Sequence, residues 1–157
     1  MLIVVREPIA SPNEKLSLVL LWAERLRLAK RIWRCTADDG QEFGFELDQP
    51  LKPGETIWET ESRRYVVNQR PETVLEIGLD LPASAAAGIG WAVGNLHLEL
   101  SAEPTRLLTP DDSAARQLLD RLGITYRSVE VIFRPGRFAR GDKSSARTQE
   151  LGSSHRH

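Results

Sequence analysis

A change of pattern at Pro71 constrains the fold of this 157-residue chain more than any other feature. Before Pro71, short runs rich in β-branched and aromatic residues alternate with turn residues, as is typical of small all-β modules. After Pro71, strand-like runs alternate with stretches of helical periodicity. The sequence therefore predicts an α+β protein with an N-terminal all-β module at residues 1–71, a second module at 72–134 and a tail at 135–157.

Two hairpins define the predicted β-module. Residues 32–36 and 42–47 flank an Asp-Gly pair, which supplies the positive φ angle that a tight turn needs. Residues 56–60 and 64–68 are expected to pair across a second polar turn. The other elements expected here are strands at 2–5 and 16–21, and a stretch at 22–29 that fits a helical turn as well as a β-corner.

The second module follows a βαββαβ order, which predicts a ferredoxin-like fold. Its first helix is expected between Pro82 and Asn95. Its second helix is expected to begin with Thr109 as N-cap and Pro110 at the first helical position, and to end at Gly123. The predicted strands are 73–77, 97–101, 105–108 and 129–133, and the predicted buried helix positions are Ala85, Ile89, Ala92, Val93, Ala115, Leu118, Leu119 and Leu122.

The tail at 135–157 is rich in Arg, Gly and Ser and has no apolar periodicity, which predicts a disordered C-terminal segment. It holds His155 and His157. Two neutral imidazoles this close in sequence can share one metal ion if the chain folds back. The alternative is a solvated tail with no ligand role.

Composition excludes several classes of partner. The net charge is −1, from 21 basic and 22 acidic residues, so neither nucleic acid nor an anionic membrane is indicated. No apolar run approaches the roughly 20 residues that span a bilayer. The first residues do not form a signal-peptide pattern, and Cys35 is the only cysteine. We therefore expect a cytoplasmic protein without an intrachain disulfide.

His97 is the only histidine outside the tail. In the predicted strand 97–101, Leu98 and Leu100 share one face, so His97 and Glu99 point to the other. The helices of a split βαβ module cover one face of the sheet, where the leucines are expected. His97 is therefore expected on the open face, available to a metal or a partner, and the alternative is a solvated strand-end histidine.

No set of catalytic residues can be argued from spacing. Cys35 lies in a predicted strand with Arg34 as its only local electropositive support, so a packed structural cysteine is favoured over a reactive thiolate. No Ser-His-Asp or Cys-His arrangement and no phosphate-loop pattern is found. The sequence therefore predicts that the chain is not an enzyme.

Three segments, in order, are similar to one family. Asp39–Gly44 followed by Leu51–Thr56 is like that family's "DGxxxG…LxxGD" run. Gly90–His97 reads GWAVGNLH and is like "AYHLGNRH". Asp112 with Leu118–Gly123 is like "DHVLxxMLxxLG". On these motifs, which cover most of residues 1 to 134, the chain resembles the urease accessory proteins of the nickel metallochaperone type, UreE.

The resemblance implies a homodimeric carrier of Ni²⁺. In that family the first module resembles a peptide-binding domain and contacts partners, while the second dimerises and carries the metal. The motif histidine, here His97, comes from both subunits and meets its copy at the two-fold axis, and tail histidines, here His155 and His157, add ligands. The resemblance further implies delivery of Ni²⁺ to the urease apoprotein through an accessory GTPase. Imidazole sites also accept Zn²⁺ and Cu²⁺, so these ions are expected to compete and the sequence leaves the metal preference open.

The departures from the family pattern lower the expected metal capacity. Leu96 stands where the motif has arginine, and Asp111, Asp112 and Ser113 stand where many members carry histidines. We therefore expect about one ion per dimer, with His97 as nearly the whole site. The alternative function is a dimeric adaptor in urease assembly with little or no metal-carrying role of its own.

Overall fold

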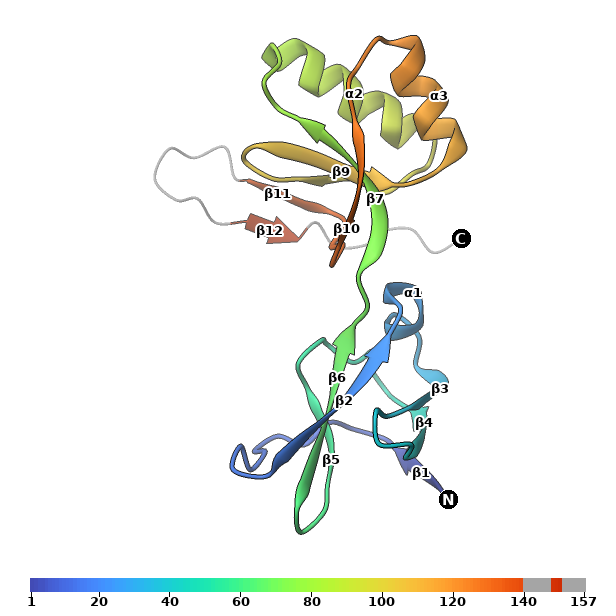
Figure 1. Cartoon of the computed structure of the whole chain (residues 1–157), viewed down its shortest axis with the longest axis vertical. Coiled ribbons are helices and arrows are strands. Elements are labelled where there is room, and N and C mark those ends of the chain that lie inside the picture. Colours follow the sequence, from blue (N-terminus) through green and yellow to red (C-terminus); the bar gives the residue numbers. More distant parts are fainter. Residues whose placement is uncertain (140–147, 151–157) are drawn as a thin grey trace. The chain divides into compact units, whose positions relative to one another are not determined.

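The structure, a computed structural model, describes residues 1–139 and 148–150 of the chain (Figure 1). The chain divides into two compact units, Met1–Arg70 (unit 1) and Pro71–His157 (unit 2). Strands predominate in unit 1, whereas unit 2 mixes strands with two longer helices, so the predicted α+β class is confirmed. Within the described ranges, no helix is long and apolar enough to cross a membrane.

Unit 1 consists of two three-stranded sheets and one short helix. The first sheet has the order β1 (Leu2–Val5), β4 (Glu42–Glu46), β3 (Ile32–Thr36), and the second has the order β2 (Ser17–Ala23), β6 (Arg63–Gln69), β5 (Thr56–Glu59), with α1 (Arg25–Leu28) after β2. Both predicted hairpins are confirmed, since β3–β4 and β5–β6 pair antiparallel. Gly40 takes the expected positive φ of 89° in the first turn. Strands β1 and β2 add to these hairpins in parallel, a long-range pairing that local patterns did not predict.

One apolar cluster joins the two sheets of unit 1. The ring of Trp33 stacks on Phe45 at a centroid distance of 4.2 Å, and Phe43 meets Tyr65 edge-on at 5.0 Å. The turn of the first hairpin is tied to β6, because the carboxylate of Asp39 accepts hydrogen bonds from the Tyr65 hydroxyl at 2.7 Å and from an Arg63 guanidinium nitrogen at 2.7 Å. Side-chain packing and this polar tie therefore hold the two sheets together.

Unit 2 has a four-stranded sheet in the order β10-β7-β9-β8, in which all neighbours are antiparallel. Its elements in chain order are β7 (Glu72–Gly78), α2 (Ala83–Asn95), β8 (Ser101–Ala102), β9 (Arg106–Pro110), α3 (Ser113–Arg121) and β10 (Arg127–Val131). The third strand lies between the first and second, and the fourth lies beside the first. That arrangement is the split βαβ pattern, which confirms the predicted ferredoxin-like module.

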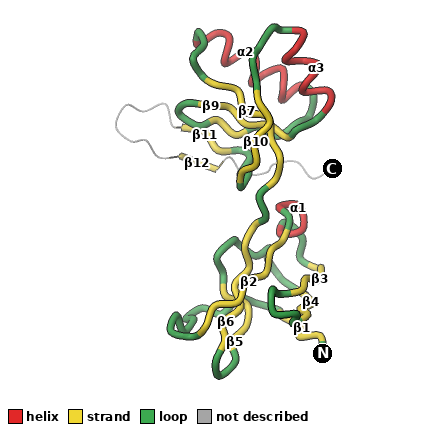
Figure 2. Tube along the Cα trace, in the orientation of Figure 1, coloured by secondary structure: helices red, strands yellow, loops and turns green. Residues whose placement is uncertain are grey.

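Both longer helices of unit 2 lie on the same side of its sheet (Figure 2). The buried cluster between helices and sheet contains Leu75, Ile77, Ile89, Val93, Leu107, Ala115, Leu118 and Leu119. On the opposite face, Val74 and Leu108 pack with Phe133, which is fully buried. Alternate residues of β7 thus serve two apolar clusters, one on each face.

The predicted start of the second helix is wrong. Thr109 and Pro110 belong to β9, where Pro110 is paired with Val74 of β7. The N-cap of α3 is instead Asp112, whose carboxylate accepts a hydrogen bond from the backbone N–H of Ala114 at 2.8 Å. Strand pairing outweighed a local capping preference, as tertiary context commonly does.

Two further differences concern positions near the chain's C-terminal part. Leu122 is 51% exposed instead of buried, because α3 ends at Arg121 and Leu122 is its C-cap. Two short strands that composition did not predict, β11 (Arg137–Ala139) and β12 (Thr148–Glu150), pair antiparallel. The remaining parts of the predicted tail, 140–147 and 151–157, lie outside the described residues.

Candidate functional site

His97 lies at the left-handed position that follows helix α2. The helix ends at Asn95 and Leu96 is its C-cap. The backbone N–H of His97 donates to the Gly94 carbonyl at 3.0 Å, and that of Leu98 donates to the Val93 carbonyl at 3.3 Å. These two bonds form a Schellman motif, which requires a positive φ at its central residue. His97 has a φ of 59° and is the one described residue other than glycine with a positive φ.

Histidine is a costly residue at this position. The left-handed conformation costs an L-residue with a Cβ about 1–2 kcal/mol relative to its ordinary region, and glycine avoids that cost. Strained backbone of this kind persists where surrounding structure fixes it, and it is concentrated at functional sites. The imidazole of His97 is exposed, so burial in the core does not explain why histidine stands there.

The segment after His97 is anchored firmly. Leu98 and Leu100 are half-buried and pack against the helix–sheet core of unit 2. The Thr109 hydroxyl donates to the Glu99 carbonyl at 2.8 Å, and the Gly136 backbone N–H donates to the Leu100 carbonyl at 2.8 Å. His97 is therefore presented on a turn that is fixed on both sides, and not at the end of a loose loop.

The strand predicted at 97–101 is wrong. Residues 98–100 belong to no strand, and β8 begins only at Ser101, which pairs with Leu108 of β9. The alternation argument that put His97 on the open face of the sheet therefore does not apply. His97 is exposed for a different reason, namely that the left-handed turn directs the chain from the helix back into the core.

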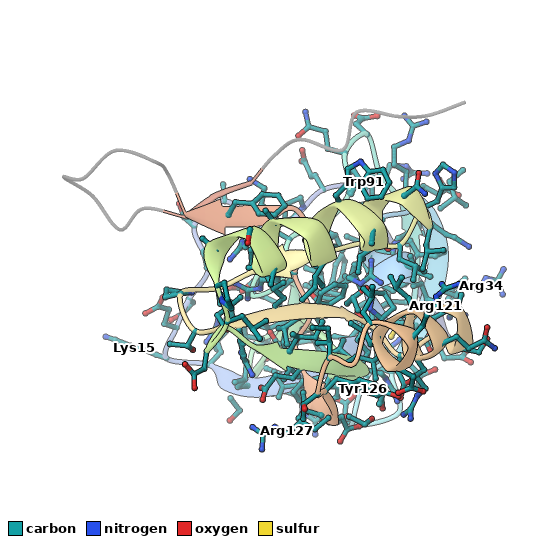
Figure 3. All side chains as sticks on the ribbon, turned by 90° about the horizontal axis from the view of Figure 1, so that it is seen from above. Lys15, Arg34, Trp91, Arg121, Tyr126 and Arg127 are labelled. Carbon is teal, nitrogen blue, oxygen red and sulfur yellow. The ribbon has the colours of Figure 1, made fainter. Side chains whose placement is uncertain are left out.

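The outer face of α2 is uncharged. From Leu81 to Leu98 the chain contains no Asp, Glu, Lys or Arg. Trp91 projects from this face and is 73% exposed (Figure 3). A Cβ built on Gly88 or Gly94 would meet nothing within 4 Å, so packing within the chain does not require these glycines. Glycine inside a helix costs about 1 kcal/mol relative to alanine, and no described contact of Gly88 or Gly94 offsets that cost.

The described residues of a single chain do not form a complete metal site. Among the described residues, no group of three or more His, Cys, Asp or Glu side chains could hold a metal ion together. The other predicted ligands, His155 and His157, lie outside the described residues. Cys35 belongs to unit 1, whereas His97 belongs to unit 2.

Cys35 has the features of a packed cysteine. Its thiol is half-buried and donates to the backbone carbonyls of Trp22 at 3.6 Å and Thr36 at 3.8 Å. Burial raises the pKa of the Cys35 thiol, although the charges of Arg27 and Arg70 act in the opposite direction. A thiol with a raised pKa is a weak nucleophile at neutral pH, in line with the structural role that the sequence favoured.

Sequence analysis did not single out the outer face of α2, the exposed helix face that precedes His97. The available signal was the uncharged run around His97, because exposed helices normally carry charged residues on their solvent side. The apolar spacing in that run predicts only the buried face of the helix. Its exposed half, with Trp91 at the centre, became evident once α2 was placed on the sheet.

These features define a class of protein: a chain with a β-rich unit and a ferredoxin-like unit that presents a strained, exposed histidine beside an uncharged helix face. Residues 72–157 match the family described as UreE urease accessory protein, C-terminal domain. The chain therefore belongs to the UreE family of urease accessory proteins, as its motifs predicted.

Individual relatives extend the similarity beyond unit 2. The chain is 31% identical to the urease accessory protein UreE of Lysinibacillus sphaericus, over 73% of this chain and 76% of that protein. It is 32% identical to UreE of Staphylococcus saprophyticus, over 73% of this chain and 79% of the relative. It is also 32% identical to UreE of Geobacillus kaustophilus, over 68% and 76% respectively.

Proposed function

We propose that this protein is a cytoplasmic, homodimeric nickel metallochaperone for urease maturation. It binds Ni²⁺ as cargo through His97 of two copies and passes the ion to the urease apoprotein through an accessory GTPase. It performs no catalysis of its own. Membership of the urease accessory family supports a role in urease maturation, and the exposed turn position of His97 supports His97 as the metal ligand.

The observation that carries the proposal is that His97 combines a positive φ with an exposed side chain. The positive φ of His97 destabilises the fold, and its exposed side chain is not part of a buried core. Histidine at this position is therefore best explained by an interaction of its imidazole with another molecule or ion. A neutral imidazole is a good ligand for Ni²⁺, and also for the competing ions Zn²⁺ and Cu²⁺.

The outer face of α2 supports a dimer with His97 near its axis. An uncharged helix face with small residues allows close approach of a second backbone, and Trp91 offers a large apolar surface for it. In a two-fold dimer the same patch meets itself, so each copy contributes one His97 to a shared site. Two imidazoles leave Ni²⁺ short of its usual about four to six ligands. Water or the tail residues His155 and His157 would supply the rest, and exchangeable ligands suit a carrier that must release its cargo.

The second candidate function is a dimeric adaptor in urease assembly with little metal-carrying role. It is favoured by one observation, the lack of any cluster of three potential ligands among the described residues of a single chain. The adaptor would bring assembly partners together through unit 1 and the dimer face. Its binding to those partners would be indifferent to a chelator and to replacement of His97.

Calorimetric titration with Ni²⁺ separates the two functions. We expect His97→Ala and His97→Asn to weaken Ni²⁺ binding by at least about 100-fold, since loss of even an outer-shell partner of a ligand can cost that much. Asparagine tolerates the left-handed conformation better than alanine, so His97→Asn removes the imidazole with little change to the turn. Equal Ni²⁺ affinity in wild type and His97→Asn would reject the metallochaperone and leave the adaptor.

A further inference from the structure

Unit 1 contains a cavity of about 540 Å³ that the function of His97 does not use. Three arginines line it: Arg27 from α1, Arg34 from β3, and Arg70 directly after β6. They belong to three separate segments, and the fold brings them to one hollow. Apolar walls are supplied by Leu2 and Trp22.

Two of these guanidinium groups are fixed by backbone carbonyls and not by carboxylates. A terminal nitrogen of Arg27 donates to the Arg34 carbonyl at 3.0 Å, and the Nε of Arg70 donates to the Trp22 carbonyl at 3.4 Å. Each group is thus oriented while most of its N–H donors are left over. Pre-positioned guanidinium groups lose less side-chain entropy when they bind an anion.

The arginines have no acidic partner within the part of the chain that the structure describes. Glu24 and Glu42 line the same cavity, yet neither forms an ion pair with Arg27, Arg34 or Arg70. Elsewhere in the chain, arginines do pair: Arg63 meets Asp39 at 2.7 Å, for example. Three arginines against two glutamates leave the lining with one net positive charge, and this favours an external anion.

The size and lining of the cavity identify the kind of ligand. A volume of this size exceeds what a single small anion fills and is within the range of pockets that take larger ligands. The combination of guanidinium groups with Leu2 and Trp22 suits a segment that carries both acidic and apolar side chains. The half-buried Cys35 thiol on the wall adds no competing negative charge while it stays protonated.

We propose that this cavity is a docking site for an acidic, partly apolar peptide segment of a protein partner, with a carboxylate of that segment bound by Arg27, Arg34 and Arg70. This rests on the proposed function, because it states the chemistry by which unit 1 would recognise a component of the urease assembly machinery. It involves neither nickel nor His97.

The test uses the full chain and two fluorescein-labelled peptides, one of alternating Glu and Val and its counterpart with Gln for Glu. Fluorescence polarisation is expected to show binding of the Glu peptide that weakens with added salt, and at least about tenfold weaker binding of the Gln peptide. Arg34→Gln is expected to weaken binding of the Glu peptide by about tenfold, the effect of losing one charge-assisted hydrogen bond. Its guanidinium makes no described ion pair, so this variant is expected to fold normally.

Arg31→Gln is the matched control, because Arg31 is an exposed neighbour that does not line the cavity. Equal losses in Arg31→Gln and Arg34→Gln would reject the site in favour of non-specific attraction. Equal binding of both peptides, or none of either, would also reject it. Displacement of the Glu peptide by equimolar inorganic phosphate would indicate a site for small anions and overturn the peptide proposal.

Cys35 provides an independent reporter of occupancy, since it is the only cysteine in the chain and lies on the cavity wall. Saturating Glu peptide is expected to slow alkylation of Cys35 by iodoacetamide, whereas the Gln peptide is not. An unchanged alkylation rate with bound Glu peptide would place the peptide elsewhere. Because no nickel is present in either assay, their failure would leave the His97 site untouched, and loss of the His97 site would leave these results intact.

Discussion

The two longer helices of unit 2 end in the same backbone motif but carry different residues at its centre. At the end of α3, Gly123 has a φ of 68°, its N–H donates to the Asp120 carbonyl at 3.1 Å, and the N–H of Ile124 donates to the Leu119 carbonyl at 2.9 Å. At the end of α2 the equivalent bonds surround His97. Glycine is the ordinary solution to this geometry, and histidine is not.

The two helices also differ in their N-caps, their charge and the exposure of their apolar residues. α3 is capped by Asp112, buries Leu118 and Leu119, and keeps charged residues on its solvent side. α2 has no side-chain N-cap, no charge, and an exposed tryptophan on its outer face. The N-cap, the buried leucines and the charged solvent side of α3 stabilise the unit. The glycines inside α2 and the positive φ that follows it reduce the stability of the unit. α3 thus has the features of a structural helix, whereas the proposed binding function rests on the outer face and the C-terminal turn of α2.

The largest expected effect is on the free energy of unfolding, and it distinguishes the buried face of α3 from the outer face of α2. Leu119 is fully buried, so Leu119→Ala is expected to lower the free energy of unfolding by about 2–5 kcal/mol. The control is Trp91→Ala, expected to change it by less than about 0.5 kcal/mol at protein concentrations low enough to keep the chain monomeric, because the side chain is exposed within one chain. Urea denaturation followed by circular dichroism measures both. A Trp91→Ala loss as large as that of Leu119→Ala would show that α2 has no free outer face.

Placing histidine at the end of α3 tests whether the left-handed position is costly. Gly123→His is expected to destabilise the protein by about 1–2 kcal/mol, since the new Cβ meets the left-handed strain but no steric clash. Ni²⁺ affinity should remain that of the wild type. A neutral effect on the unfolding free energy would remove the strain argument for His97.

The reverse substitution at the end of α2 is expected to stabilise the chain. His97→Gly relieves the positive-φ strain and should raise the unfolding free energy by about 1 kcal/mol, part of the gain being offset by the greater freedom of glycine in the unfolded chain. The same variant should lose tight Ni²⁺ binding. Stability and metal binding would then move in opposite directions, and a destabilised His97→Gly protein would contradict the account.

The smallest expected effect is a pH dependence at the start of α3. Asp111 accepts two hydrogen bonds from the guanidinium of Arg116, at 2.6 and 2.9 Å, and these hold the pKa of its carboxyl below the ordinary value. A lowered folded-state pKa means that the pair stabilises fully above the unfolded-state pKa of about 4, and that this contribution is lost as the pH falls through the folded-state pKa. Unfolding curves of wild type and Asp111→Asn should differ at neutral pH and converge in acid. A constant difference down to acid pH would show that the ion pair is not its source.

Local signals in the sequence predicted most elements of the fold. The Asp-Gly turn before β4 and the apolar spacing along α3 depend on neighbouring residues; the turn was found as expected, and so were the buried positions of α3 apart from Leu122. The parallel addition of β1 to β4 depends on long-range packing, and it was not foreseen. Likewise, the arginines of the unit 1 cavity come from three separate segments, so no local motif marked them.

The candidate site was predicted correctly in the exposure of its histidine and wrongly in its backbone geometry. His97 and the two leucines after it alternate as they would in a strand, but an anchored segment outside any strand half-buries Leu98 and Leu100 in the same way. Strand pairing starts only at Ser101. Periodicity alone cannot tell these two cases apart, since it reports which side chains are buried and not which backbone groups are paired.

Native mass spectrometry of the Ni²⁺-loaded protein tests the central claim most directly, namely that the fold holds His97 in a strained turn so that two copies can share one ion. We expect wild-type dimers with one Ni²⁺ per two chains, and His97→Asn dimers of the same protein mass with no Ni²⁺. Nickel retained at the same ratio by His97→Asn, or one Ni²⁺ on each single chain of the wild type, would contradict the account.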